Sequence, residues 1–117
     1  IHILSSISRC IRKGIGCIEF HQGDARFQHV CERAVSGRWR QFDFICEDAT
    51  HDLVDTLRIL LYLWPAVRPG GIYVIEEFAN VHSLRSNIKA LWPNVEIIDT
   101  TGPSGGVEPL VVLRKPL

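Results

Sequence analysis

The chain lacks several features that would assign it to a protein class at once. It has no methionine, its formal net charge is zero, and its four cysteines form no CxxC pair. We therefore expect reduced, buried thiols in place of a disulfide framework or a zinc site. The N-terminus lacks the charged region, apolar run and cleavage site of a signal peptide, and no apolar run is long enough to span a bilayer. These absences predict a cytoplasmic protein with no membrane or nucleic-acid partner.

The length of 117 residues is that of one domain, residues 1–117, which is small for an α/β enzyme. The chain begins IHILSS, without an initiator methionine. We interpret this beginning as that of a fragment or of a processed segment.

Apolar periodicity predicts alternating strands and helices. In chain order, we expect a strand at 17–21, a helix at 25–35, a strand at 42–46, a helix at 53–67 that Pro65 kinks or closes, a strand at 72–75, a helix at 83–91, and strands at 95–99 and 110–113. The last two strands are joined by a Gly- and Pro-rich segment that is too short for a crossover helix, so we expect them to be antiparallel. The pattern predicts an α/β fold with a mostly parallel sheet between two helix layers.

Acidic residues follow the two central strands of this prediction. Glu47 and Asp48 come after the first of them, and Glu76 and Glu77 come after the second. Because adjacent parallel strands point their carboxyl ends at one crevice, we expect these carboxylates to cluster. Carboxylate oxygens suit Mg²⁺, and His51, three residues after Asp48, suits proton abstraction. The constellation is typical of an enzyme, although ordinary solvated loop carboxylates remain an alternative.

Two segments resemble motifs of a known family. FDFICEDATH, residues 42–51, resembles FDxIxDDGSH, and LWPAVRPGGIYVIEEF, residues 63–78, resembles LxPxLxPGGxYVIED. These motifs are similar to those of one branch of the class I S-adenosylmethionine methyltransferases, which have a Rossmann-like fold that also ends in an antiparallel hairpin. The branch includes metal-dependent O-methyltransferases of macrolide sugars and related proteins called cephalosporin hydroxylases.

The resemblance implies roles for individual residues. The second Asp of DDGSH corresponds to Asp48, and the acidic pair of VIED corresponds to Glu76 and Glu77, so these three would bind Mg²⁺. The histidine of the motif corresponds to His51, which would be the general base on the acceptor hydroxyl. Read without the family, His51 is a residue at a helix start, where Asp48 or Thr50 would be the better cap.

The same resemblance implies where S-adenosylmethionine would bind. The turn at Gly23 and Asp24 would lie against the adenosyl group, and Glu47 would lie near the methionine side. Read without the family, Gly23 and Asp24 form an ordinary strand-to-helix turn in which Asp24 is the cap.

The chain departs from the family pattern at several positions. Glu47 replaces the first Asp of DDGSH, Ala49 and Thr50 replace Gly-Ser, and Glu77 replaces the Asp of VIED. No glycine-rich GxGxG turn precedes Cys17. The resemblance therefore predicts an N-terminally truncated fold, and residues 1–117 alone are expected to bind S-adenosylmethionine weakly or not at all.

The function implied by the resemblance is Mg²⁺-assisted O-methyl transfer from S-adenosylmethionine to a small-molecule hydroxyl acceptor, a sugar or other natural product. The alternative is a non-catalytic methyltransferase-like domain without cofactor binding, which the missing glycine turn favours. An oxygenase is a third interpretation. It is disfavoured because the usual facial triad has two histidines and one carboxylate, and only His51 stands near these acids.

Overall fold

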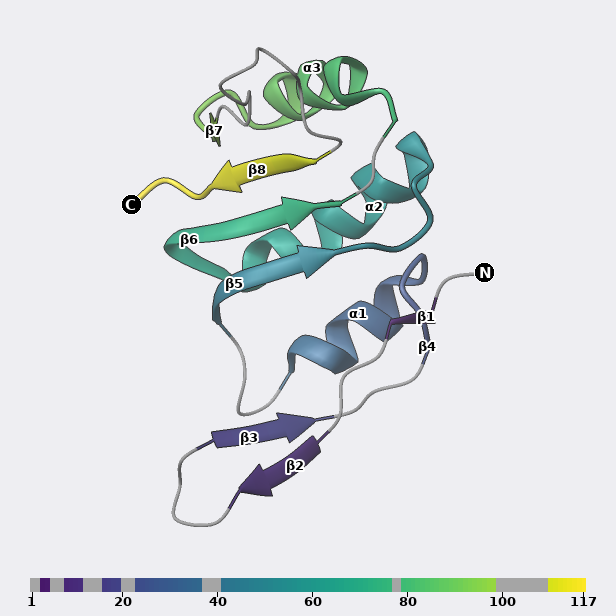
Figure 1. Ribbon diagram of the computed structural model, residues 1–117, viewed down its shortest axis with the longest axis vertical. Helices are drawn as coiled ribbons and strands as arrows, with labels where there is room; N and C mark the ends of the chain where they lie inside the picture. Colours follow the sequence, from purple (N-terminus) through teal and green to yellow (C-terminus); the bar gives the residue numbers. More distant parts are fainter. Residues whose placement is uncertain are drawn as a thin grey trace, which may run out of the picture.

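The computed structural model describes residues 23–36, 41–76, 79–98 and 110–117, together with the backbone of three short strands before them. The elements are β1 (Ile3–Leu4), β2 (Ser8–Ile11), β3 (Gly16–Glu19), β4 (Gly23–Asp24), α1 (Gln28–Val35), β5 (Phe42–Glu47), α2 (Leu53–Leu63), the 3-10 helix η3 (Trp64–Ala66), β6 (Val67–Ile75), α3 (Val81–Leu91), β7 (Glu96–Ile98) and β8 (Val111–Arg114). Figure 1 shows how these elements are arranged.

The main sheet has four strands in the order β5-β6-β8-β7. Strands β5 and β6 are parallel, with Cys46 opposite Val74, whereas β8 is antiparallel to both β6 and β7. Strands β5, β6 and β7 therefore run in one direction, and β8 runs against them (Figure 1). The predicted C-terminal hairpin and the predicted adjacency of the two central strands are both confirmed.

Helix α2 begins and ends where side chains and backbone stop it. Its N-cap is Asp52, whose carboxylate accepts a hydrogen bond from the Asp55 N–H, so the expected cap at Asp48 or Thr50 is wrong. The reason is the backbone of His51, whose φ of 62° keeps the chain out of the helix until Asp52. At the other end Pro65 converts the chain into η3, and the α-helix stops before the expected end at residue 67.

Helix α1 begins later than residue 25, where the periodicity placed its start. Its N-cap is Phe27, which makes no side-chain cap hydrogen bond. Asp24, the expected cap, instead accepts a hydrogen bond from the Arg26 N–H at 3.0 Å and from the Arg26 guanidinium. The Asp24 carboxylate is therefore bonded within the turn before the helix and does not cap α1.

One face of the sheet carries the core. The register aligns Tyr73 with Ile45 and Leu113, and the buried apolar residues of all three helices pack against this face. We call it the Tyr73 face. Tyr73 on this face and Leu60 of α2, which belongs to the same core cluster, are both fully buried.

The opposite face, which we call the Phe44 face, consists of Phe44, Cys46, Ile72, Val74, Val112 and Arg114. Phe44 is 57% exposed, and no helix in the described part of the chain packs here. The described helices cover one face of the main sheet, and the expected second helix layer stays a prediction. The run FDFIC is apolar at Phe44, although that side chain is exposed.

The strand expected at 17–21 is present as β3, but it lies outside the main sheet. It pairs antiparallel with β2, with Cys10 opposite Cys17. Only residues 12–15 separate the two strands, and so short a connection joins antiparallel neighbours. Strands β1 and β4 form a second small antiparallel pair, with Leu4 opposite Gly23. Figure 1 shows β2 and β3 beyond α1, away from the four-stranded sheet.

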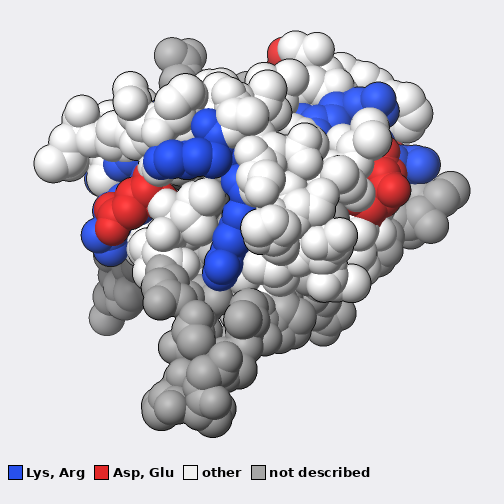
Figure 2. Space-filling view, turned by 90° about the horizontal axis from the view of Figure 1, so that it is seen from above, with Lys and Arg blue, Asp and Glu red and all other residues white. Residues whose placement is uncertain are grey.

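The surface carries charges of both signs. Figure 2 shows separate patches of Lys and Arg side chains, some of them directly beside acidic side chains. The ion pairs of the surface include Arg68 with Asp43 at 2.9 Å and Arg114 with Glu96 at 3.5 Å. Among the described residues, no helix has the length and apolar character needed to cross a membrane.

Candidate functional site

The carboxyl ends of β5 and β6 meet at one edge of the sheet. The Glu76 N–H donates a hydrogen bond to the Glu47 carbonyl oxygen at 2.9 Å, one step beyond the last paired residues of the two strands. This bond brings the start of the Asp48–His51 loop beside Glu76. We call the group Asp48, His51 and Glu76 the rim.

Within the rim, the imidazole of His51 faces the carboxylate of Asp48. The distance between Nε2 of His51 and Oδ1 of Asp48 is 3.5 Å, and the two side chains are 32% and 49% exposed. His51 is the only described residue other than glycine with a positive φ. Such a backbone is unfavourable for a side chain with a Cβ and is often found where function requires a particular orientation. The pair is therefore accessible and held in a specific geometry.

Glu47 turns away from the solvent. It is 6% exposed and lies on the Tyr73 face, where one of its oxygens accepts a hydrogen bond from the Ala49 N–H at 3.1 Å. Burial raises the pKa of the Glu47 carboxyl above its ordinary value, and the hydrogen bond from Ala49 opposes that shift. The side chain anchors the loop that carries Asp48 and His51. Its expected contact with a cofactor stays a prediction.

Gly23 and Asp24 lie against α1. A Cβ on Gly23 would stand 2.7 Å from Cγ1 of Val30, so only glycine fits this close approach of strand and helix. The Asp24 carboxylate pairs with the Arg26 guanidinium at 2.6 Å, and this hydrogen bonding lowers its pKa to about 2. Their predicted contact with an adenosyl group also stays a prediction.

Two cysteine side chains are described, and they differ in exposure. Cys31 is buried, as expected, but Cys46 is exposed, so the expectation of buried thiols is wrong for Cys46. Burial and a hydrogen bond with the Glu76 carboxylate raise the pKa of the Cys46 thiol to about 11. Sequence reasoning did not include Cys46 in the site. Strict alternation along FDFICE was the available signal, because Cys46 must face opposite to Glu47.

Two of the three predicted metal ligands are described, and both lie on the rim. Glu77 lies outside the described residues, and within them no group of three or more His, Cys, Asp or Glu side chains is placed to hold a metal ion. Asp48 and Glu76 nevertheless fit Mg²⁺ by their chemistry. This ion is commonly held by one or two carboxylates, and water fills its other coordination positions.

Comparison with known proteins gives one informative likeness. No protein-family model and no curated protein matches the chain. A solved structure does: the MycE methyltransferase from the mycinamycin biosynthetic pathway, in complex with Mg and SAH, superposes with a TM-score of 0.59 at 20% sequence identity. The chain therefore shares its fold with part of MycE. The likeness covers 81% of this chain but only 31% of the MycE chain, so the chain spans about a third of that protein's length.

Proposed function

We propose that this chain carries the metal-binding and proton-abstracting part of an S-adenosylmethionine-dependent O-methyltransferase that acts on a hydroxyl of a small molecule, such as a sugar or another natural product. The observation that carries the proposal is the hydrogen bond from the Glu76 N–H to the Glu47 carbonyl oxygen. It brings the backbone of Glu76 beside the start of the loop that carries the accessible Asp48–His51 pair. The fold shared with MycE, which was solved with Mg and SAH, supports the same reading.

The residues of the rim have separate tasks in this proposal. His51 accepts the proton of the acceptor hydroxyl, while the hydroxyl oxygen forms a bond to the methyl carbon and the sulfur–carbon bond of the methyl donor breaks. Asp48, whose carboxylate oxygen lies 3.5 Å from Nε2 of His51, orients the imidazole. Mg²⁺ bound by Asp48, Glu76 and Glu77 would lower the pKa of the acceptor hydroxyl.

The loop geometry matters because alignment supplies much of the rate in methyl transfer. The donor is already activated, so the protein mainly has to hold the oxygen in line with the methyl carbon. The anchored carboxylate of Glu47 and the positive φ of His51 hold the base in one orientation.

The test is the effect of Mg²⁺ on thermal unfolding. An ion that binds the folded chain alone stabilises it by about 2.7 kcal/mol at one hundred times its dissociation constant. We expect Asp48→Asn to abolish this stabilisation and His51→Ala to retain it. Asp43→Asn is the matched control, because Asp43 is an exposed carboxylate near the other end of the same strand.

Two results would contradict the proposal. Melting curves that do not change with Mg²⁺, Mn²⁺ or a chelator would show that the rim holds ordinary solvated carboxylates. The chain would then be a non-catalytic methyltransferase-like domain. Equal loss of the Mg²⁺ effect in Asp48→Asn and in Asp43→Asn would show that the ion acts through general charge screening.

A further inference from the structure

A pocket of about 340 Å³ lies at the other end of the sheet from the rim. Its walls come from the start of η3, the end of α3 with the connection to β7, and the residues after β8. Strand β6 runs from this pocket, where Val67 begins it, to the rim at Glu76. The pocket is therefore separated from the proposed active site by the length of that strand.

Two indole rings form the apolar wall of the pocket. The ring centroids of Trp64 and Trp92 are 6.2 Å apart, and the rings are inclined at 52°. A flat ring inserted between them would need a separation of about 7 Å, because carbon atoms pack at about 3.5 Å on each side. A ligand therefore lies across the indole pair, where Pro93 and Pro116 extend the apolar lining.

The pocket is held in place by hydrogen bonds from two lysines. Lys89 Nζ donates to the Val95 carbonyl oxygen at 2.9 Å. The backbone N–H of Trp92 donates to the Ile88 carbonyl oxygen at 2.8 Å. Lys115 Nζ donates to the carbonyl oxygens of Trp64 and Val67 at 3.0 and 2.8 Å. These bonds tie the three segments of the wall together, so the pocket is formed before any ligand arrives.

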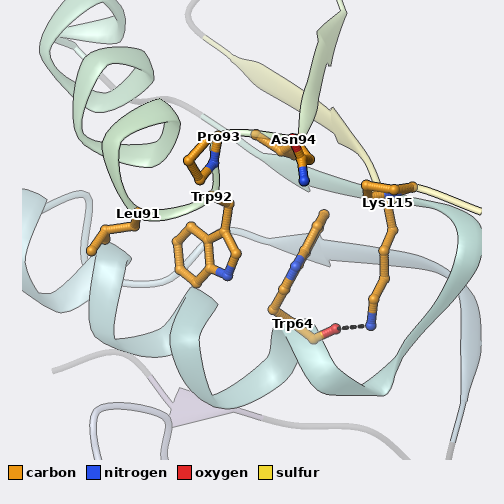
Figure 3. Close-up of a pocket in the computed structure, with 8 residues that line it drawn as sticks. Trp64, Leu91, Trp92, Pro93, Asn94 and Lys115 are labelled. Atoms are coloured by element: carbon orange, nitrogen blue, oxygen red, sulfur yellow. Dashed lines mark hydrogen bonds between the residues drawn. The ribbon is translucent and has the colours of Figure 1, made fainter.

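Lys115 also supplies the charge. Its ammonium lies 5.6 Å from the centroid of the Trp64 ring, and Figure 3 shows its stem running beside that ring. An ammonium has three N–H donors, of which the two carbonyl bonds use two. Burial lowers the pKa of Lys115, because the group is partly removed from water. An anion that approached the third donor would restore some of the lost solvation.

A further polar group at the pocket is the side-chain amide of Asn94, which Figure 3 shows beside Pro93. None of the described side chains that line the pocket is acidic. Glu96, just beyond it, is paired with Arg114 at 3.5 Å. The lining therefore offers an aromatic surface, one cation and one amide. No acidic side chain of the described lining would repel an anion.

From these observations we propose that the pocket is a second binding site, for a small planar aromatic carboxylate whose ring lies across Trp64 and Trp92 and whose acid group contacts Lys115. Its volume is within the usual range of small-molecule sites, about 300–1,000 Å³. The two indoles favour an aromatic ring. The ammonium of Lys115 favours a carboxylate over the corresponding neutral amide. The site is independent of the rim and of the reaction proposed there.

The experiment titrates the ¹⁵N-labelled chain with 2-naphthoate and follows the indole N–H signals by NMR. The neutral analogue 2-naphthamide is titrated in parallel. We expect saturable shifts of the Trp92 signal with a dissociation constant of about 1 mM or lower for 2-naphthoate. Because a hydrogen bond to a charged group is worth more than a neutral one, the amide should bind about tenfold more weakly.

Variants assign the two parts of the site. Trp92→Ala should weaken the binding of both ligands about tenfold. Trp92→Phe should retain most of the affinity, because it keeps an aromatic ring. Lys115→Gln removes the ammonium and its bonds to the Trp64 and Val67 carbonyl oxygens, and it should abolish the tenfold preference for 2-naphthoate over 2-naphthamide. Leu61→Ala removes a 58% exposed side chain elsewhere on α2 and should change neither ligand. His51→Ala should also change neither, which separates this site from the rim.

The proposal is overturned if the Trp92 shifts do not saturate, or if Lys115→Gln retains the preference for the carboxylate. Should Trp92→Ala fail to fold, Lys115→Gln and Trp92→Phe decide the question by themselves. Binding that is lost in His51→Ala but kept in Lys115→Gln would locate the ligand at the rim and refute a second site.

Discussion

Glu47 is a carboxylate held on the helix-covered side of the sheet, next to the loop that bears His51. Burial raises the pKa of the Glu47 carboxyl in the folded chain above its ordinary value of 4.5. The folded chain therefore holds this proton more tightly than the unfolded chain does, and stability is lost as the pH rises from the unfolded pKa through the folded pKa. Glutamine keeps the oxygen that accepts the Ala49 N–H and carries no charge.

We predict that Glu47→Gln is more stable than the natural chain at pH 7 and that its advantage disappears near pH 4. Urea unfolding at both pH values measures the difference. Glu96→Gln, which changes an exposed carboxylate, should show no gain at pH 7. An equal gain for Glu47→Gln at both pH values would mean that the charge is not the cause.

At the scale of the elements, the side chain of Asp52 stabilises the start of α2. Asp52 caps α2 through the Asp55 N–H at 3.1 Å, and the helix then presents its apolar side, which includes Ile59, Leu60 and Leu63, to the sheet. An uncapped helix start leaves backbone N–H groups without partners. The cap therefore also defines where the loop of the rim ends.

We predict that Asp52→Ala lowers the free energy of unfolding by about 1 kcal/mol, while Asp52→Asn retains most of the stability because its side chain still has an oxygen acceptor. Chemical denaturation followed by circular dichroism gives both values. If alanine and asparagine destabilise the chain equally, the charge of Asp52 matters and the cap does not.

At the scale of the whole molecule, the described sheet has helices on one face only. The Phe44 face places Phe44, Ile72, Val74 and Val112 side by side in register, with Cys46 between them. Contiguous apolar side chains on an open sheet face attract hydrophobic dyes and other chains.

We predict that Phe44→Thr lowers the fluorescence of 8-anilinonaphthalene-1-sulfonate added to the folded chain. Its free energy of unfolding should change by no more than about 0.5 kcal/mol, because the side chain is already exposed and threonine suits a strand. Leu61→Ala, an equally exposed apolar change on α2, should leave the dye signal unchanged. A large loss of stability in Phe44→Thr would show that the side chain is covered in solution.

The sequence by itself predicted the parts of the fold that depend on short-range patterns. The apolar run FDFIC, the three-and-four spacing of apolar residues in α2 and α3, and the Gly- and Pro-rich segment before β8 are local. They predicted β5, the two helices and the antiparallel pair of β7 and β8. The adjacency of β5 and β6 followed from the single helix between them, and it places the backbone of Glu76 beside that of Glu47. The metal and base roles of Asp48, His51 and Glu76 stay predictions. Glu77, the remaining predicted ligand, lies outside the described residues.

Only the tertiary structure decided the partner of β3 and the face that each side chain occupies. β3 reads as a sheet strand, yet it pairs with β2 because the connection between them is short. Glu47 and Cys46 are neighbours in the chain, but the sheet buries the first under the helices and exposes the second. Periodicity shows that a strand has two different sides, but the face that is buried depends on helices distant in the sequence. The pocket at Trp64 and Lys115 is of the same kind, because its walls are brought together only when β8 closes the sheet against β6.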